Sequence, residues 1–171
     1  MNAGSAAIRQ RYSIGATRTI DVRAESLVDV VRANTDRVPA GTFGDVDEED
    51  EVGADVSFEV TGVQGPLADV GDATRMAGTV VIVGYHQGGT REIPLGNWNW
   101  KALRVVNAHF REVAAIMRGM RTGMRLLTSG RLEIGDLVTH RFGLDEVGDA
   151  FQIAVDKPAG FLKATVVIGE D

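Results

Sequence analysis

The 171-residue sequence contains no cysteine. This absence excludes disulfide bonds and thiolate zinc sites within the chain. Only three histidines are present, His86, His109 and His140, and their positions lack metal-ligand spacing. We therefore expect no zinc site in this chain.

Long apolar runs and an excess of basic residues are also missing. No run approaches the roughly 20 residues that span a bilayer, and residues 1–5 lack the layout of a signal peptide. The formal net charge of −6 argues against a nucleic-acid surface, because phosphate binding favours a basic patch. We expect a soluble, cytoplasmic protein that binds neither nucleic acid nor membranes.

Much of the acidity lies in one segment, residues 45–51, which holds six acidic side chains. We interpret this segment as a solvated insertion. A cation site is the alternative, but the segment lacks the alternating ligands and the fixed glycine of a calcium loop.

The pattern of apolar residues predicts an α/β fold, since short strand-like runs alternate with amphipathic helices. Residues 78–83 form the most apolar and branched run, as expected of a strand covered on both faces. The expected strands are 19–22, 55–60, 78–83, 104–108, 137–142 and 162–168. The expected helices are the end of one at 6–14, then 26–34, 66–76, 112–129 and 144–155.

The helix expected over 112–129 has two distinct sides. The apolar side consists of Val113, Ile116, Met117, Met120, Met124 and Leu127. We interpret it as a core-facing side. Arg118, Arg121 and Arg125 lie on another side, which we interpret as solvated. A docking surface for an acidic partner or a nucleotide phosphate is the alternative.

Three expected strands end in small, turn-prone tripeptides, at residues 61–63, 83–85 and 107–109. In open α/β sheets, ligands bind outside the carboxyl ends of the strands. Glycine at such a position lets the backbone approach a flat ring closely. The strand ends are therefore the first place to look for a ligand site.

Several motifs together resemble the medium-chain dehydrogenase/reductase family, in its zinc-type alcohol and polyol branch of sorbitol and threonine dehydrogenases. They are residues 15–21 (GATRTID), 53–62 (GADVSFEVTG), 78–84 (GTVVIVG), 132–151 (ending in LDEVGDAF) and 160–164 (GFLKA). The resemblance spans roughly residue 6 to the end, apart from the acidic segment. It implies hydride transfer between a secondary alcohol and NAD or NADP, with zinc polarising the oxygen.

The resemblance also implies roles for individual residues. Those expected along the nicotinamide half of NAD(P) are Thr61, Gly62, Val83, Gly84, Tyr85, Asn107 and Ala108. Lys163 matches a basic position that approaches the cofactor pyrophosphate. Weaker candidates for substrate contact are His86, His109 and Arg111, whereas Trp98, Trp100 and His140 are expected to serve packing.

Parts of the family pattern are missing from this sequence. It has no glycine-rich turn after a first strand and no acidic residue after a second strand, which would bind the pyrophosphate and the ribose. We therefore expect a partial Rossmann-like α/β fold, with a doubly wound and mostly parallel sheet. It would lack its first two strands and the GroES-like catalytic domain.

We expect the truncated nucleotide-binding domain, residues 1–171, to consist of four segments. They are a remnant of a helix and the third strand (1–36), the acidic loop insertion (37–54), the second half of the Rossmann-like fold (55–130) and a C-terminal return segment (131–171). Without strands 1 and 2 of a 3-2-1-4-5-6 sheet, residues 55–60 would expose an apolar edge.

The functional expectations follow from these gaps. NAD or NADP binding should be weak or lost in the isolated chain, and turnover should require a separately encoded N-terminal catalytic half. The family counterpart of strand 104–108 pairs across a two-fold axis, so we expect a homo-oligomer through this edge. Two alternatives stay open: a non-enzymatic, degenerate or oligomerising Rossmann-like module, and a zinc-free relative similar to quinone reductases.

Overall fold

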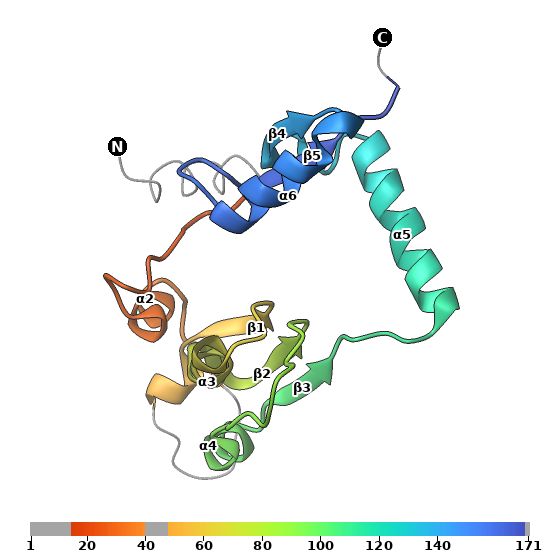
Figure 1. The fold of residues 1–171 in the computed structure, drawn as a ribbon. Coiled ribbons are helices and arrows are strands. Elements are labelled where there is room, and N and C mark those ends of the chain that lie inside the picture. Colours follow the sequence, from red (N-terminus) through yellow and green to blue (C-terminus); the bar gives the residue numbers. More distant parts are fainter. Residues whose placement is uncertain (1–14, 40–47, 170–171) are drawn as a thin grey trace. The chain divides into compact units, whose positions relative to one another are not determined.

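The computed structural model describes residues 15–39 and 48–169 (Figure 1). The chain forms two compact units: unit 1 comprises Met1–Thr19 and Glu112–Asp171, and unit 2 comprises Ile20–Arg111. The helix end expected at residues 6–14, and Asp45 and Asp47 of the acidic segment, lie outside the described residues.

Unit 2 is built on a parallel sheet with the strand order β1-β2-β3. The strands are β1 (Ala54–Glu59), β2 (Thr74–Ile82) and β3 (Arg104–Asn107). Both pairs of neighbours run parallel, so the strands expected at 55–60, 78–83 and 104–108 and the α/β fold class are confirmed.

Three helices accompany this sheet: α2 (Leu27–Ala33), α3 (Gln64–Ala73) and α4 (Leu95–Trp100), with a short 3-10 helix, η1 (Glu48–Glu51). Helix α2 begins where the sequence predicts, since the Ser26 hydroxyl accepts from the Asp29 amide at 3.3 Å. Leu67 and Val70 of α3 pack with Val80 of β2 and Trp98 of α4 in the core of the unit.

Helix α4 is not among the helices that the sequence predicts. Trp98 is 3% exposed and packs so closely on α3 that a Cβ on Gly71 would lie 1.9 Å from the indole nitrogen. The packing role expected of Trp98 is confirmed. Lys101, fully buried after α4, donates from Nζ to the carbonyls of Gly71 (3.1 Å) and Asp72 (3.2 Å). Lys101 thus satisfies carbonyls at the end of α3.

The strand expected at 19–22 is wrong. The Asp21 carbonyl accepts from the amides of Ala24 (2.8 Å) and Glu25 (3.0 Å), which makes a turn, and its carboxylate accepts from the Arg23 side chain at 3.0 Å. These local hydrogen bonds compete with strand pairing. In the described part of the chain, β1 consequently has β2 as its only neighbour.

The expected apolar edge at β1 is confirmed. Val56 is 47% exposed and Phe58 is 62% exposed. They alternate with Ser57 and Glu59, which lie on the face of the sheet that α3 covers. The sequence predicts helices on both faces of the sheet. Within the described residues of unit 2, the helices lie on one face.

Unit 1 contains α5 (Val113–Thr128), β4 (Val138–Phe142), α6 (Val147–Asp156) and β5 (Lys163–Val166), with 3-10 turns η2 (Gly135–Leu137) and η3 (Leu144–Glu146). β4 and β5 pair in parallel. The apolar side of α5, expected to face a core, is exposed: Val113 is 72% and Met120 61% exposed. No described element of the unit packs along α5.

Candidate functional site

The sheet of unit 2 brings the three predicted strand ends to one edge. Glu59 pairs with Ile82, and Ile82 pairs with Asn107, so β1, β2 and β3 end at the same level. The Ala108 amide donates to the Ile82 carbonyl at 2.9 Å. Seven of the predicted cofactor residues therefore gather along this edge, at positions 61–62, 83–85 and 107–108; we call it the carboxyl edge. Their role toward a cofactor stays a prediction.

A buried carboxylate, which the sequence interpretation overlooked, organises the carboxyl edge. The side chain of Glu59, at the end of β1, has no solvent exposure. Its Oε1 accepts from the Thr61 amide (2.8 Å), the Thr61 hydroxyl (2.5 Å) and the Gly62 amide (3.0 Å). Its Oε2 lies 2.8 Å from Nε2 of His86. A signal for Glu59 was present, because an acid inside an apolar strand is rarely buried without partners.

Hydrogen bonds decide the protonation state of Glu59. Burial raises the pKa of its carboxyl, but the donors from Thr61, Gly62 and His86 together outweigh burial and hold the pKa below its ordinary value. Glu59 is therefore ionised at neutral pH. Because an ionised carboxylate only accepts hydrogen bonds, Nε2 of His86 donates to it, whereas Nδ1 of His86 is buried without a partner among the described residues. A buried polar atom without a hydrogen-bond partner costs about 1–3 kcal/mol.

Backbone contacts lock the same two loops together. The Glu59 carbonyl accepts from the amides of Val83 and Gly84, both at 2.8 Å. A Cβ on Gly84 would lie 2.3 Å from Oε2 of Glu59 and 2.4 Å from the Gly62 nitrogen. Gly62 has φ +73°, and a Cβ there would lie 2.8 Å from the Tyr85 carbonyl oxygen. Both glycines are thus required by close backbone approach.

An aromatic pair stands at the carboxyl edge. The rings of Tyr85 and His109 stack with centroids 5.1 Å apart and planes 18° apart. The Asn107 side chain fixes the start of this segment by accepting from the His109 amide at 3.0 Å. Tyr85 is 57% exposed, so its ring is available to a flat ligand. Of the weaker candidates, His86 and His109 lie at this edge, and Arg111 is exposed.

Polar contacts hold the segment after β2 against the start of α3. Gln64 Nε2 donates to the Glu92 carbonyl at 2.7 Å, and its Oε1 accepts from the Glu92 amide at 3.0 Å. Nη2 of Arg91 donates to the carbonyls of Gln87 (2.8 Å) and Gly62 (3.4 Å). The segment after β2 therefore contacts both the loop after β1, through Arg91, and the start of α3, through Glu92.

An apolar hollow of about 200 Å³ lies along the free side of β1. Glu59 and Thr61 line it, and its apolar walls are formed by Leu27, Val31, Phe58, Val60, Pro66 and Val70. These residues come from α2, β1 and α3 and the loops beside them. The hollow therefore extends from the carboxyl edge along the unpaired edge of β1, beside α2 and α3.

Lys163, the eighth predicted residue, belongs to unit 1, where it begins β5. It lines a mostly apolar hollow of about 350 Å³ together with Val147 and Phe151 of α6 and Phe161. The other seven residues belong to unit 2, and the role of Lys163 toward the pyrophosphate stays a prediction.

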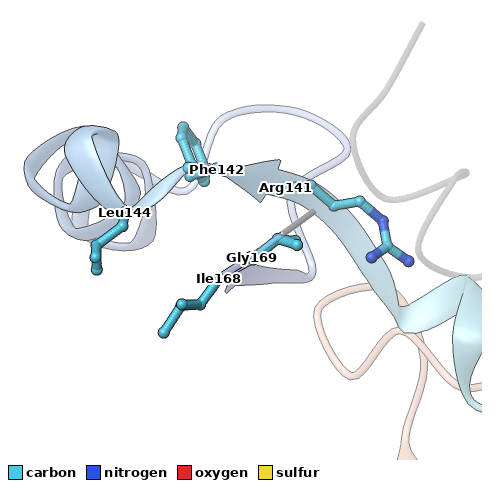
Figure 2. A pocket seen from close by; sticks show the side chains of 7 residues that line it. Arg141, Phe142, Leu144, Ile168 and Gly169 are labelled. Atoms are coloured by element: carbon cyan, nitrogen blue, oxygen red, sulfur yellow. The ribbon is translucent and has the colours of Figure 1, made fainter. Parts of the chain in front are cut away.

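A second hollow in unit 1, of about 480 Å³, lies where β4 and β5 end (Figure 2). Figure 2 shows Leu144 and Ile168 as apolar walls, with the Arg141 side chain extending away from them. Arg141 is its one ionisable lining residue, and none of the predicted site residues lines it.

The residues present fit a nicotinamide better than a metal. Across residues 15–39 and 48–169, no three histidine, aspartate or glutamate side chains gather in a way that could hold a metal ion. We therefore derive no step through zinc. At the carboxyl edge, the two glycines expose backbone and the Tyr85 side chain offers a flat surface to the ring of a ligand.

In the described part of the chain, no helix has the length and apolar character needed to cross a membrane.

Comparison with known proteins gave no match to a protein-family model. The chain is 31% identical over 144 residues to L-threonine 3-dehydrogenase of Ruegeria pomeroyi, covering 82% of this chain and 36% of that protein. It is 37% identical over 103 residues to sorbitol dehydrogenase of Gallus gallus, covering 57% of this chain and 26% of that protein. The chain thus spans about a third of the length of these relatives, or less.

Solved structures of dehydrogenases also match this chain. A protein described as a zinc-binding dehydrogenase, from Sinorhizobium meliloti and bound to NADP, is 26% identical with a TM-score of 0.66. The match covers 95% of this chain and 42% of that one. The partial coverage agrees with the parallel, incomplete sheet of unit 2. The chain belongs to the medium-chain dehydrogenase/reductase family, in its zinc-type alcohol and polyol branch, and represents part of the nucleotide-binding half.

Proposed function

We propose that the chain supplies the nicotinamide-facing part of a dinucleotide site. Completed by an N-terminal half, it would take part in hydride transfer between a secondary alcohol and NAD or NADP. The observation that carries this proposal is the gathering of Thr61–Gly62, Val83–Tyr85 and Asn107–Ala108 at the carboxyl edge. The NADP bound to the Sinorhizobium meliloti relative supports the choice of cofactor.

The isolated chain lacks the other parts of such a site. It has no glycine-rich pyrophosphate turn and no ribose carboxylate, which supply much of the affinity for a dinucleotide. Lys163 is exposed, and one exposed charge contact is worth about 1 kcal/mol or less. The isolated chain should therefore bind NAD(H) weakly and show no turnover.

The relatives suggest the substrate class. Their names specify L-threonine, L-arabinitol and sorbitol, each of which carries a secondary hydroxyl group. A secondary alcohol with further polar groups is therefore the class we propose for the completed enzyme.

Complementation tests this function. The chain is co-expressed with the part of Ruegeria pomeroyi L-threonine 3-dehydrogenase that precedes the matched segment, and NAD reduction is measured with each of the three alcohols. We expect turnover only when both parts are present with zinc. Zinc-dependent NAD reduction by the pure chain alone would contradict the proposed division of the site.

A second candidate function is a non-enzymatic module that assembles through its sheet edges. The observation in its favour is the exposure of apolar strand residues: Val105 and Val106 of β3 are 45% and 36% exposed. An unprotected strand edge is a template for pairing with another chain. NADH binding at the carboxyl edge would separate the first candidate from this one.

A further inference from the structure

The carboxylate of Glu59 joins two loops that come from different strands. Loop 1 (residues 60–63) follows β1, and loop 2 (residues 83–87) follows β2. Oε1 holds loop 1 through Thr61 and Gly62. Oε2 holds loop 2 through His86. One side chain therefore bonds both of the loops that carry most of the predicted nicotinamide contacts, beside the backbone contacts of Val83 and Gly84 with the Glu59 carbonyl.

The burial of this charge depends on the conformation of both loops. An ionised carboxylate is stable out of water only when its oxygens accept hydrogen bonds. All four donors to Glu59 come from loops 1 and 2. If loop 2 moves away from loop 1, the carboxylate keeps its donors from Thr61 and Gly62 but loses the contact with His86, so the charge favours the closed arrangement.

His86 shows that the closed arrangement is held by Glu59. Its Nδ1 is buried without a partner among the described residues, which costs free energy. The Nε2 contact to Glu59 is the polar contact that offsets this cost. The other charged group beside the loops, Arg91, bonds the carbonyl of Gly62 and does not reach the carboxylate. The backbone contacts of Val83 and Gly84 hold the start of loop 2, whereas the Glu59 carboxylate is what the His86 ring itself bonds.

We propose that Glu59 is a positioning residue for the cofactor: it clamps loops 1 and 2 so that the backbone at Gly62 and Gly84 faces the nicotinamide ring in a fixed arrangement. This inference rests on the proposed function of the carboxyl edge. His86 takes part as the loop 2 end of the clamp. Neither side chain is assigned a part in the chemical step.

The test compares matched variants of the full chain. Glu59→Gln removes the charge and keeps the shape. Glu51→Gln is the control, because Glu51 is also buried (5% exposed) in unit 2 and is paired at 2.7 Å with Arg37, away from the loops. His86→Gln keeps an N–H that can reach Glu59, whereas His86→Ala removes it.

NADH is titrated into each isotope-labelled chain up to millimolar concentration, and backbone amide shifts at the carboxyl edge are followed. We expect Glu59→Gln and His86→Ala to weaken NADH binding by about tenfold. His86→Gln should restore most of the affinity. Glu51→Gln should lower thermal stability but leave NADH binding unchanged. If Glu59 had only a structural role, Glu59→Gln would likewise lower stability without weakening NADH binding.

The outcomes separate the inference from the proposed function. If the wild-type chain shows no NADH-dependent shifts at the carboxyl edge, the proposed function fails. If the wild type binds but Glu59→Gln binds equally well, the positioning role is overturned. Should Glu59→Gln not fold, the His86 pair decides: equal affinity of His86→Ala and His86→Gln overturns the clamp.

Discussion

The lack of space for a methyl group at Gly84 gives a sharp test of the packing at the carboxyl edge. A Cβ there would lie 2.3 Å from Oε2 of Glu59 and 2.4 Å from the backbone nitrogen of Gly62. Separations under 3.0 Å do not occur for real Cβ atoms, and the Gly62 contact is backbone that cannot rotate away. Gly84→Ala must therefore push loop 1 and loop 2 apart.

The cost of Gly84→Ala can be worked from these contacts. Overpacking typically costs about 1–3 kcal/mol, and weakening a hydrogen bond to a charged group adds about 1.5–3 kcal/mol. We expect the free energy of unfolding of unit 2 to fall by about 2.5–6 kcal/mol. For a unit of this size the melting temperature should fall by roughly 10 °C or more.

Gly96→Ala is the matched control for this measurement. Gly96 lies in α4 of the same unit, and a Cβ there would meet no atom within 4 Å. Alanine favours a helix over glycine by about 1 kcal/mol or less, so Gly96→Ala should leave stability unchanged or slightly raised. Denaturant unfolding, followed by tryptophan fluorescence, measures both variants. A Gly84→Ala protein as stable as Gly96→Ala would refute the close approach of the two loops.

Three further predictions concern other parts of the structure. Lys101→Ala should destabilise unit 2 by about 2–4 kcal/mol in thermal unfolding, because it uncaps two carbonyls of α3 and leaves a cavity. Since burial lowers the pKa of Lys101 from its ordinary 10.5, stability should rise as the pH rises toward 10.5, and this slope should vanish in Lys101→Ala. The lowered pKa of Glu59 contributes stability above its ordinary 4.5 that is lost as the pH falls through the folded-state pKa; acid unfolding of Glu59→Gln should lack this part. Light scattering at micromolar concentration should find an oligomer of the wild type and smaller species of Val106→Lys, whereas a wild-type monomer of 18.3 kDa would argue against pairing through β3.

The elements found by sequence reasoning are those set by local pattern. The branched, apolar run at 78–83 is part of β2, and Ser26 caps α2 as predicted. Residues 19–22 also contain branched side chains, but they lead into a turn at residues 21–25 instead of forming a strand. A strand needs a partner, and the sequence does not show that β1 pairs only with β2 within the described residues.

The sequence predicts only part of the candidate site, again because local patterns are visible in a sequence and long-range contacts are not. Gly62 and Gly84 could be predicted because glycines at strand ends are a local signal of close backbone approach. Glu59 was overlooked because its role depends on His86, 27 positions later in the chain. Helix α4 was also missed, since it depends on Trp98 packing against Gly71 rather than on helix propensity.

The central claim is that the carboxyl edge faces the nicotinamide end of the cofactor. Saturation-transfer NMR on the wild-type chain with excess NADH tests it most directly, because it reports separately on the protons at each end of the ligand. We predict weak binding in which the nicotinamide protons receive the most saturation, since the chain lacks the turn that would hold the pyrophosphate. Saturation centred on the adenine protons, or none on NADH at millimolar concentration, would contradict the claim.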